Sequence, residues 1–583
     1  MNIEISPFSL PSIATLGIPP SKSRMARAIV IAGLTGDLAF VEKLLQHPTS
    51  DIRHAAQGMY KLIHDDAPVH LHLGQSGTAL RLLTAVASLI SKEVYITGDA
   101  QLLRRPLIPL LNALRSMGAE IVCTDKEGFA PLHILPHPLR STSEIDATTW
   151  GSSQYLSALL LIAPQLPGGL KIKYDGKMPS FKYVDLTLRM MMDAGAHFHQ
   201  TSEMIEVEEG KYRETLTYNI SGDWSSAAYW IALLALSPDL KELIIPNLVA
   251  DPTQADSCII DLMERLEVTY RPGEAVIRKS GAVSLPQKIN LSGSPDLFPI
   301  LSVCYCLLSI PVEISGLEQL RFKESPRLET MCKGLEKLGY GVKQIGEGTF
   351  HYDGRPPHSS IEEPVTIDSK DDHRITMAFS IASIFLPHPI LITDRESVRK
   401  SFPTFFRSLE FLNLSHQKGL YIRKSQMEDL DRMEELYANA RNFMHTHGNP
   451  NQWTGGYPTR EQLVKDINKG GSYLCCDSAT GNIEGVFYFV LEPEPTYAVI
   501  YEGRWLSDRP YGVIHRIASA GNRRRVAQYC FKWCGTLCES IRIDTYKDNQ
   551  PMLRAIKKAG FVPCGTILLR DGSPRLAFQK DID

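Results

Sequence analysis

The chain has 583 residues, of which 43% are hydrophobic and 22% charged, and its formal net charge is −3. This length is too great for one hydrophobic core and predicts about three or four domains. The near-neutral charge balance gives no overall basic surface, so we expect no nucleic-acid partner.

The cysteines and the apolar runs indicate the compartment. Eleven cysteines follow no regular framework, which is typical of a reducing environment. The first residues show no cationic start followed by an apolar core, and no apolar run reaches the roughly 18 residues that span a membrane. We therefore expect a cytoplasmic monomer without a membrane partner.

The first predicted helix opens within PPSKSRMARA, residues 19–28. Pro20 and Ser21 are typical of a helix start, and apolar residues continue at helical spacing. The first two turns hold three cations, although a helix N-terminus already carries about half a positive charge; these are Lys22, Arg24 and Arg27. Because cations are unfavourable there, either the helix tolerates this cost or a bound anion neutralises it, and the segment favours the anion.

Five further segments repeat this organisation, in which small or polar residues open an apolar helix. They begin 71 to 78 residues apart and read GQSGTALRLLTAVASLI from Gly74, GSSQYLSALLLIAPQL from Gly151, GDWSSAAYWIALLAL from Gly222, GSPDLFPILSVCYCLL from Gly293 and DDHRITMAFSIASIF from Asp371. Because these helices are apolar on nearly all sides, we expect them to be buried. Strand-like sequence follows each, so a compact α/β unit is used six times. Six helix N-termini directed at one cleft would bind anions through free N–H groups.

The helix openings also carry charged side chains, which capping by glycine and serine does not explain. They are Lys22, Arg27, Arg81, Asp296, Lys323, Arg327, His373 and Arg374. In RFKESPRLE, Lys323 and Arg327 share a helix face and Glu324 lies between them. Arginine offers a planar fork to carboxylate or phosphate and lysine a point charge. This stretch predicts either an anion site or a solvated charged face.

Seven motifs follow one another along this part of the chain: SKSRMAR, SGTALRLLTA, RRPLIPLLNALRSMGA, GSSQYLSALL, FKESPRL, DDHRITMA and KSFP. Together they resemble the 5-enolpyruvylshikimate-3-phosphate synthase family over roughly residues 1–413. The resemblance implies an α/β fold of two globules, each built from three βαβαββ units around a central cleft. One globule would comprise residues 1–19 and 222–413, and the other residues 20–221. The implied reaction transfers the enolpyruvyl group of phosphoenolpyruvate to the 5-hydroxyl of shikimate 3-phosphate and releases phosphate.

The resemblance also implies roles for the residues that match the motifs. Shikimate 3-phosphate would be bound by Lys22, Ser23, Arg27, Ser152, Ser153, Gln154, Ser180, Tyr183, Asp296, Gln319 and Lys323. Phosphoenolpyruvate would be bound by Lys22, Gly77, Arg105, Gln154, Arg327, Arg374 and Lys400. The catalytic set would be the acid–base carboxylates Asp296 and Glu324, Lys22 at the departing phosphate, and His373 beside the second substrate. Both partners are small anionic molecules, and neither a metal nor an organic cofactor is expected.

Three positions depart from the family pattern, because Gln75, Gln319 and Asp371 stand where asparagine is usual. Gln319 still offers an amide to the sugar phosphate, whereas Asp371 adds negative charge near anions. An alternative is the UDP-N-acetylglucosamine enolpyruvyl transferase family, which typically uses a loop cysteine as an acid. The corresponding loop here, GDAQLLRRPL, has no cysteine and offers Arg105. A catalytically inactive anion-binding module is a further alternative, against which the two carboxylates argue.

The remainder of the chain starts afresh after residues 414–419, which lack periodicity and are predicted as a linker. Residues 420–583 predict an α/β domain that begins with a strand, a capping box from Ser425 to Glu428 and an amphipathic helix. Three cysteines lie four apart on a later helix, at Cys530, Cys534 and Cys538. A single helical stripe favours buried small hydrophobes over a tetrahedral zinc site.

The order of these elements, with GVIHRIAS and DNQPMLRAIKKAGF, resembles the GNAT N-acetyltransferases over roughly residues 420–583. The resemblance implies acetyl-CoA as co-substrate, bound by Ile517, Arg523, Arg524, Arg525, Val526, Ala527 and Asn549. Arg525 stands where glycine is common in the turn that holds the CoA pyrophosphate, and Ile556 where a tyrosine often acts as the acid. The run of arginines either binds the pyrophosphate by charge or is a solvated helix face. Glu502 is the best candidate for a general base. The domain is either an acetyltransferase for an unknown amine or a binding or structural appendage, and we expect it to fold alone.

Overall fold

Six buried helices form the interior of the first 400 residues in a computed structural model, which describes residues 1–90, 92–140, 144–176, 178–214, 216–357 and 365–582. They are α1 (Lys22–Thr35), α4 (Gly77–Leu89), α6 (Ser153–Ile162), α8 (Trp224–Leu236), α10 (Phe298–Leu307) and α12 (His373–Phe385). Most of their side chains are buried, as their all-round apolar sequences predict. The six repeated openings therefore do mark the six core helices.

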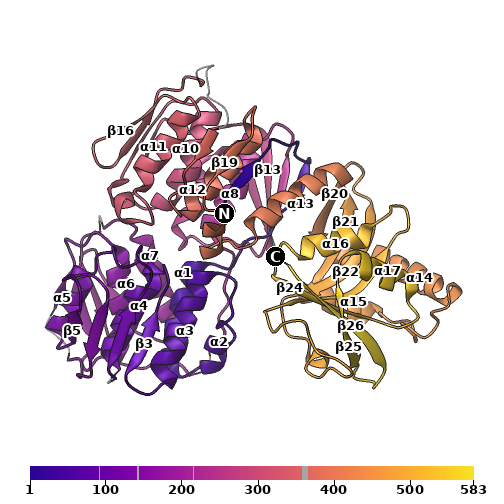
Figure 1. The fold of residues 1–583 in the computed structure, drawn as a ribbon, viewed down its shortest axis with the longest axis horizontal. Coiled ribbons are helices and arrows are strands. Elements are labelled where there is room, and N and C mark those ends of the chain that lie inside the picture. Colours follow the sequence, from indigo (N-terminus) through magenta and orange to yellow (C-terminus); the bar gives the residue numbers. More distant parts are fainter. Residues whose placement is uncertain (91, 141–143, 177, 215, 358–364, 583) are drawn as a thin grey trace.

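The helices α1, α4 and α6 pack together in the globule drawn in indigo and purple (Figure 1). Two four-stranded sheets of mixed direction belong to it, with strand orders β3-β4-β6-β5 and β7-β8-β10-β9. The strands are β3 (Val69–His72), β4 (Val94–Thr97), β5 (Glu120–Cys123), β6 (Leu132–Leu135), β7 (Ile145–Asp146), β8 (Leu170–Lys173), β9 (Phe198–Gln200) and β10 (Met204–Val207). The other helices are α2 (Leu38–Glu42), α3 (Ser50–His64), α5 (Ile108–Ser116) and α7 (Lys182–Asp193).

The unit that begins with α1 departs from the expected βαβαββ pattern. Residues 36–68 form α2 and α3 and contain no strand, so the described parts of the two globules hold five sheets instead of six. The reason is the helical spacing of the apolar residues in α3, where Ile52, Ala56, Met59 and Leu62 bury one face. A half-buried strand would need strict alternation instead.

The helices α8, α10 and α12 form the interior of the upper globule in Figure 1, drawn from pink to orange. Its sheets have the strand orders β12-β13-β11-β2, β14-β15-β17-β16 and β1-β19-β18. The N-terminal strands join this globule, since β2 pairs with β11 and β1 with β19. The strands are β1 (Ile3–Ile5), β2 (Ile13–Thr15), β11 (Glu242–Pro246), β12 (Glu264–Arg271), β13 (Glu274–Ser284), β14 (Lys288–Asn290), β15 (Val312–Ser315), β16 (Val342–Ile345), β17 (Thr349–Tyr352), β18 (Val365–Ile367) and β19 (Ile390–Ile392). The other α-helices are α9 (Ile259–Leu262), α11 (Arg327–Lys337) and α13 (Phe405–Lys418).

Two chain segments that pass between the globules lie side by side. Pro20 forms an isolated antiparallel bridge with Gly222. The N–H of Ser21 donates to the carbonyl of Ser221 at 2.8 Å, and the N–H of Asp223 donates to Pro19 at 3.0 Å. The two globules are thus connected at one paired point, directly before α1 and α8.

The C-terminal domain, drawn from orange to yellow in Figure 1, is built on one seven-stranded sheet with the order β20-β21-β22-β23-β24-β26-β25. Its strands are β20 (Leu420–Lys424), β21 (Ser472–Asp477), β22 (Ile483–Val490), β23 (Gly512–Ser519), β24 (Ser540–Thr545), β25 (Val562–Leu568) and β26 (Pro574–Asp581). Only β23 and β24 pair in parallel. Its α-helices are α14 (Leu430–Thr446), α15 (Arg460–Asn468), α16 (Val526–Cys534) and α17 (Gln550–Lys558). The expected α/β fold class is confirmed for both parts of the chain.

The predicted linker at 414–419 is wrong, because α13 continues to Lys418 and ends at Gly419 in the left-handed conformation. The helix does not separate the two parts of the chain but belongs to both. Leu409 and Leu412 lie in the core of the upper globule, whereas Phe411 packs on Tyr529 in the C-terminal domain. If this segment were a linker with solvent around it, its apolar residues would be exposed.

The predicted capping box is displaced by one residue. The side chains of Gln426 and Asp429 make the reciprocal bonds, whereas the buried Ser425 hydroxyl has no hydrogen-bond partner among the described residues. Bidentate pairing of Arg423 with Asp429, at 2.7 Å for both contacts, fixes this register.

Two features bear on metals and membranes. In the described part of the chain, no group of three or more His, Cys, Asp or Glu side chains is arranged to hold a metal ion. The thiols of Cys530, Cys534 and Cys538 are buried, and burial raises the pKa of Cys538 to about 12. None of the helices in the ranges described above is long and apolar enough to cross a membrane.

Candidate active site

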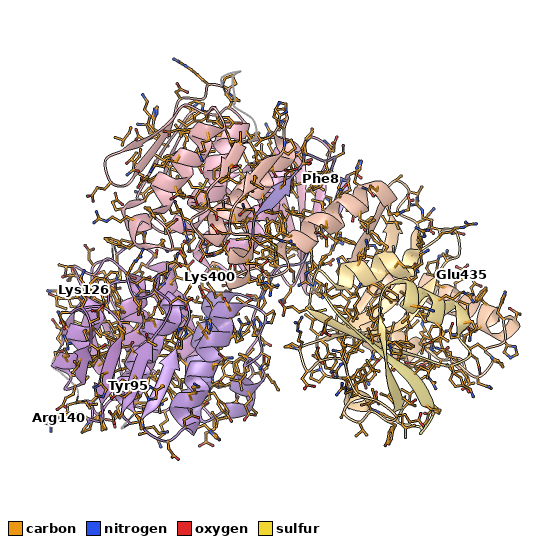
Figure 2. The ribbon with its side chains drawn as sticks, viewed as in Figure 1. Phe8, Tyr95, Lys126, Arg140, Lys400 and Glu435 are labelled. Carbon is orange, nitrogen blue, oxygen red and sulfur yellow. The ribbon has the colours of Figure 1, made fainter. Side chains whose placement is uncertain are left out.

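A cavity of about 110 Å³ lies between the two globules and is lined by polar side chains from both. Every residue predicted to bind shikimate 3-phosphate lines it. Gly77, Arg105, Arg327 and Arg374 from the predicted phosphoenolpyruvate set also line it. Lys400 lies just behind this wall, between the globules in Figure 2, and its ammonium contacts the Glu324 carboxylate at 2.7 Å. Residues up to 378 positions apart in sequence are thus brought together.

The N-termini of the core helices supply much of the cavity wall. Side-chain oxygens of Ser76, Ser152, Asp223 and Asp372 accept bonds from the first N–H groups of α4, α6, α8 and α12. The start of α1 differs, because the hydroxyl of Ser21 makes no capping bond. The first N–H groups of α1 are therefore available to an anion, which agrees with the anion predicted at this helix.

Arg27 is buried at the base of the cavity and is held by polar groups of the same globule. Its Nε donates to the Thr187 hydroxyl at 2.6 Å, and its Nη2 donates to the carbonyl of Tyr183 at 2.9 Å. Burial lowers the pKa of Arg27 to about 10, so the guanidinium remains charged at neutral pH. Lys22, one turn earlier, pairs with Asp51 at 3.0 Å.

The carboxylate of Asp296 lies among three cations on the wall of the upper globule. Arg327 contacts it at 2.8 Å, Arg374 at 2.9 Å and Lys323 at 3.3 Å. Burial acts to raise the pKa of Asp296, but these three cations outweigh it and hold that pKa well below its usual range. Asp296 is therefore ionised at neutral pH and can accept a proton.

Glu324 is the second acid and joins the two globules. Arg327 contacts its Oε2 at 2.8 Å, while Lys400 and Arg105 contact its Oε1 at 2.7 Å and 3.1 Å. Burial acts to raise the pKa of Glu324, but Lys400, Arg105 and Arg327 outweigh it and hold that pKa well below its usual range. One guanidinium therefore lies between the two acid–base candidates.

His373 is the first residue of α12 and is 1% exposed. Burial holds the pKa of His373 well below its usual range, so the imidazole is neutral at neutral pH. Among the described residues neither ring nitrogen has a hydrogen-bond partner, although the ring lines the cavity. A buried polar group without a partner is unfavourable, and a substrate oxygen in the cavity would satisfy it.

Sequence reasoning missed several carboxylates of the site. Asp372 is fully buried and accepts from Arg327 at 2.9 Å and 3.2 Å. Its N-cap position in DDHR could have indicated it, since aspartate is a preferred cap. Asp51 lies on the amphipathic helix α3, and nothing in that pattern indicates that it meets Lys22.

The three departures from the family pattern lie near the site. The amide of Gln319 lines the cavity and donates to the carbonyl of Ser292 at 3.2 Å. Gln75 and Asp371 do not line the cavity, and the amide of Gln75 donates to the Asp371 carboxylate at 2.9 Å across the two globules. Two of the departures are therefore partners.

A second, larger cavity of about 1280 Å³ lies in the C-terminal domain, where β23 and β24 diverge. The two strands pair only over Gly512–Ile514, and the residues beyond line the cavity. Of the predicted acetyl-CoA ligands, four line this cavity: Ile517, Val526, Ala527 and Asn549.

Three arginines predicted to bind acetyl-CoA do not line the cavity. Arg523 is instead held by the Asp477 carboxylate and donates to the carbonyl of Lys418 at 2.8 Å. Arg525 has a φ of +68°, in the left-handed region that favours glycine. Arg524 is exposed. Glu502 also lies outside, beside a different crevice, because the chain between η7 (Pro495–Tyr497) and β23 carries it to the far end of the sheet.

Two acidic residues and a histidine lie close together in the C-terminal domain. Nε2 of His515 lies 3.3 Å from Glu494, and its Nδ1 lies 3.8 Å from Asp544. All three line the large cavity. Hydrogen bonding from His515 lowers the pKa of Glu494 to about 2, which leaves this carboxylate ionised.

Two α/β globules that direct buried helix N-termini, cations and two carboxylates at one cavity define an enzyme for anionic substrates. The sequence model of EPSP synthase (3-phosphoshikimate 1-carboxyvinyltransferase) matches residues 49–409. The chain is 33% identical over 400 residues to the 3-phosphoshikimate 1-carboxyvinyltransferase of Bacteroides fragilis, covering 68% of this chain and 94% of that protein. It is 32% identical over 407 residues to that of Methanothermobacter thermautotrophicus, covering 67% and 94%. The chain therefore belongs to the EPSP synthase family and has its activity, 3-phosphoshikimate 1-carboxyvinyltransferase.

Solved structures agree in fold with the first part of the chain. EPSP synthase from Acinetobacter baumannii covers 70% of this chain and 97% of its own, with a TM-score of 0.55 and 23% identity. A GNAT-family acetyltransferase from Streptococcus agalactiae covers 28% of this chain and 97% of its own, with 31% identity and a TM-score of 0.27. The predicted synthase activity is confirmed, and the role of the C-terminal domain remains a proposal.

Proposed function

We propose that the cavity between the globules binds both substrates of the synthase reaction, each held mainly by one set of cations. Shikimate 3-phosphate would lie against the starts of α1 and α6, on Lys22, Ser23, Arg27, Ser152, Ser153, Gln154, Ser180, Tyr183, Asp296, Gln319 and Lys323. Phosphoenolpyruvate would lie on Lys22, Gly77, Arg105, Gln154, Arg327, Arg374 and Lys400. Two multiply charged anions repel each other, and a cluster of cations from both walls offsets that repulsion.

The observation that carries the mechanism is the position of Arg327 between Asp296 and Glu324, 2.8 Å from each. Asp296, ionised by its three cations, takes the proton of the 5-hydroxyl of shikimate 3-phosphate. The hydroxyl oxygen forms a bond to the vinyl carbon of phosphoenolpyruvate at the same time. Glu324 gives its proton to the methylene carbon, which becomes a methyl group. In the second step Glu324 takes a methyl proton back, the carbon–oxygen bond to phosphate breaks, and the enol ether forms.

Glu324 must carry a proton for the first step, although its pKa is held low in the structure. Arg105 and Lys400 produce much of that effect and belong to the proposed phosphoenolpyruvate site. A bound phosphate and carboxylate would compete for these cations, and the pKa of Glu324 would then rise. Lys22 would stabilise the departing phosphate, and neutral His373 would donate or accept one hydrogen bond to substrate.

An assay of phosphate release from shikimate 3-phosphate and phosphoenolpyruvate on the full-length protein tests these roles. Glu324→Gln keeps the shape of the side chain but cannot transfer the proton. We expect turnover to fall by about 10²- to 10⁴-fold, the usual contribution of a positioned acid–base group. Turnover near that of the wild type would remove Glu324 from the mechanism.

We propose that the C-terminal cavity binds acetyl-CoA and that the domain acetylates an amine. The divergence of β23 from β24 supports this proposal, because a ligand with amide groups can continue the ladder that β24 leaves after Ile514. Ile517, Val526, Ala527 and Asn549 would contact it. His515, oriented by Glu494, would take the proton of the amine as the amine nitrogen forms a bond to the thioester carbon. The carbon–sulfur bond would then break, and the sulfur would take that proton and leave as the CoA thiol.

Calorimetric titration of the full-length protein with acetyl-CoA tests this second function. We expect heat of binding that is lost when Ala527 is replaced by Trp, which fills the cavity wall. We expect binding to weaken as salt rises, because other cations line the cavity, among them Lys465, Arg516 and Arg570, although the arginines of residues 523–525 do not. No heat for the wild type would favour the alternative, a non-catalytic appendage.

A further inference from the structure

Gln75 and Asp371 form a direct bond between the two globules at the rim of the synthase cavity. Gln75 lies in the turn between β3 and α4, directly before the capping Ser76. Its Nε2 donates to Oδ2 of Asp371, 296 residues later, at 2.9 Å. Both side chains are half-buried, and neither lines the cavity itself. The pair is therefore placed to join the walls without contacting substrate.

The turn that presents Asp371 is held in a strained conformation. Lys370 and Asp371 both have a φ of +55°, in the left-handed region that non-glycine residues rarely adopt. The carboxylate of Asp394 fixes the turn, accepting from the N–H of Asp371 at 3.1 Å and from the hydroxyl of Ser369 at 3.1 Å. Strain of this kind persists only where surrounding contacts require it, and the conformation directs Asp371 toward the opposite globule.

The next residue connects this turn to the cations of the site. The carboxylate of Asp372 accepts from Arg327 and from Ser325, and it also caps α12 at the N–H of Arg374. Displacement of the turn would therefore move both Arg327 and the start of α12. On the opposite wall, Gln75 is two residues from Gly77, which lines the cavity.

The cavity must open for catalysis. Its lining residues come from both globules, so separation of the globules opens the path by which substrates enter and product leaves. The globules are joined at the paired segments around Pro20 and Gly222, and a rotation there would separate Gln75 from Asp371.

We propose that Gln75 and Asp371 form a latch that holds the globules closed over the substrates and sets the position of Arg327 and Arg374. The inference rests on the proposed function of the cavity. Both are positioning residues, because they act through the arginines. The amide and the carboxylate are matched, since the carboxylate accepts and the amide donates. An asparagine at position 75 would reach less far, because its side chain is one methylene shorter.

A double-mutant cycle in the full-length protein tests the latch. Gln75→Ala and Asp371→Ala should each raise the KM for phosphoenolpyruvate about three- to tenfold, with kcat changed less than twofold. The double variant should be no worse than the worse single variant, since both remove the same bond. Gln75→Glu should raise the KM for phosphoenolpyruvate more than Gln75→Ala does, because it places a second carboxylate against that of Asp371. Adding Asp371→Asn to Gln75→Glu should restore most of the affinity for phosphoenolpyruvate.

Small-angle scattering gives a readout that does not depend on chemistry. Phosphoenolpyruvate added with shikimate 3-phosphate should reduce the radius of gyration of the wild type, and the double variant should need about three- to tenfold more of it. Gln344→Ala is the control, because in the described part of the chain that exposed amide bonds only within its own turn.

Four results separate the latch from the function on which it rests. Additive effects in the cycle, or a Gln75→Glu variant no worse than Gln75→Ala, would overturn the latch. If the Gln75 and Asp371 variants have the kinetics of the wild type while Arg327→Ala is inactive, the latch is overturned and the proposed site is not. Normal kinetics in Arg327→Ala would overturn the proposed site.

Discussion

Arg327 and Asp372 form a bidentate ion pair that is almost completely buried. The Nε and Nη2 atoms of Arg327 donate to Asp372 at 2.9 Å and 3.2 Å, with side-chain exposures of 1% and 0%. The third nitrogen, Nη1, is thereby directed at Asp296 at 2.8 Å. A structural pair thus fixes the guanidinium that the proposed mechanism uses, and stability and activity are connected through one residue.

Arg327→Ala is expected to weaken phosphoenolpyruvate much more than shikimate 3-phosphate. Loss of a desolvated charge partner typically costs about 2–5 kcal/mol of binding free energy. The change also leaves Asp372 buried without its cation, which lowers stability by about 3–5 kcal/mol. Separate titrations with each substrate and a thermal melt measure both effects. Arg321→Ala, on an exposed ion pair with Glu347, is the control and should change neither. Equal loss of affinity for the two substrates would show that the subsite is wrongly assigned.

Asp296→Asn is expected to lower kcat for phosphate release by about 10²- to 10⁴-fold. The amide cannot accept the 5-hydroxyl proton, although it fills the same space between Lys323 and Arg374. The KM values should change less than kcat, because shape and hydrogen bonding are retained. Asp353→Asn, on an exposed loop, serves as the control. A variant with nearly normal kcat would exclude Asp296 as the base.

Gly77→Ala is expected to raise the KM for phosphoenolpyruvate about tenfold, equivalent to roughly 1.4 kcal/mol. An added Cβ would lie 2.2 Å from Nη1 of Arg105 and 2.8 Å from Nη1 of Arg81. Arg105 would have to move away from Glu324 and from the proposed phosphoenolpyruvate site. Gly281→Ala meets no atom within 4 Å and should leave KM unchanged. Steady-state kinetics of both variants measure the effect. An unchanged KM for phosphoenolpyruvate in Gly77→Ala would show that the site tolerates the added methyl group.

His373 predicts how stability depends on pH. Its pKa in the folded protein lies well below the ordinary 6.5, because burial disfavours the cation. Between these two pKa values the unfolded chain binds more protons than the folded chain, so stability is fully present above about pH 6.5 and is lost as pH falls. The slope is at most about 1.4 kcal/mol per pH unit. The melting midpoint of the wild type should therefore fall more steeply between pH 6.5 and 5 than that of His373→Gln.

The acids of the site change stability in a different pH range, so the comparison of the wild type with His373→Gln remains specific for His373. Asp296 and Glu324 have depressed pKa values in the folded protein, so their contribution is complete above their ordinary values of 3.8 and 4.5. It is lost only below about pH 4.5. His47 has a pKa lowered to about 4 by burial and adds a slope of the same sign to both proteins. Equal slopes in the wild type and His373→Gln would mean that His373 is not held neutral.

Truncation after Lys418 is expected to destabilise the synthase, although every proposed catalytic residue is retained. The C-terminal domain shares a hydrophobic cluster with the upper globule through Ile244 and Val276, and Leu537 packs on Gly17. Each large apolar side chain that becomes exposed loses about 1.5–3 kcal/mol. The truncated protein should retain turnover at low temperature but melt at a lower temperature than the full chain. An unchanged midpoint would restore the view that the two parts fold independently.

Much of the synthase site is present in the linear order of the sequence. The repeated helix openings predict anion sites because a helix N-terminus exposes N–H groups wherever the helix lies. Lys22, Arg327 and Asp296 could be identified from motifs for this reason. Local sequence patterns also predicted β23 and the cysteine-containing helix of the C-terminal domain correctly. The capping box predicted from them was one residue away from its position in the structure.

The tertiary structure alone decided which of these groups meet. No periodicity relates Gln75 to Asp371 or Lys22 to Asp51, because their contact depends on the closure of two globules and on the packing of α3. The predicted linker became the end of α13 because both of its faces are covered, by cores that are far apart in sequence. Arg523 was expected at a pyrophosphate, and Asp477 at the end of β21 holds it instead. Local sequence determines what a segment exposes, whereas the partner that neutralises its charge or covers its apolar face is chosen only when the whole chain folds.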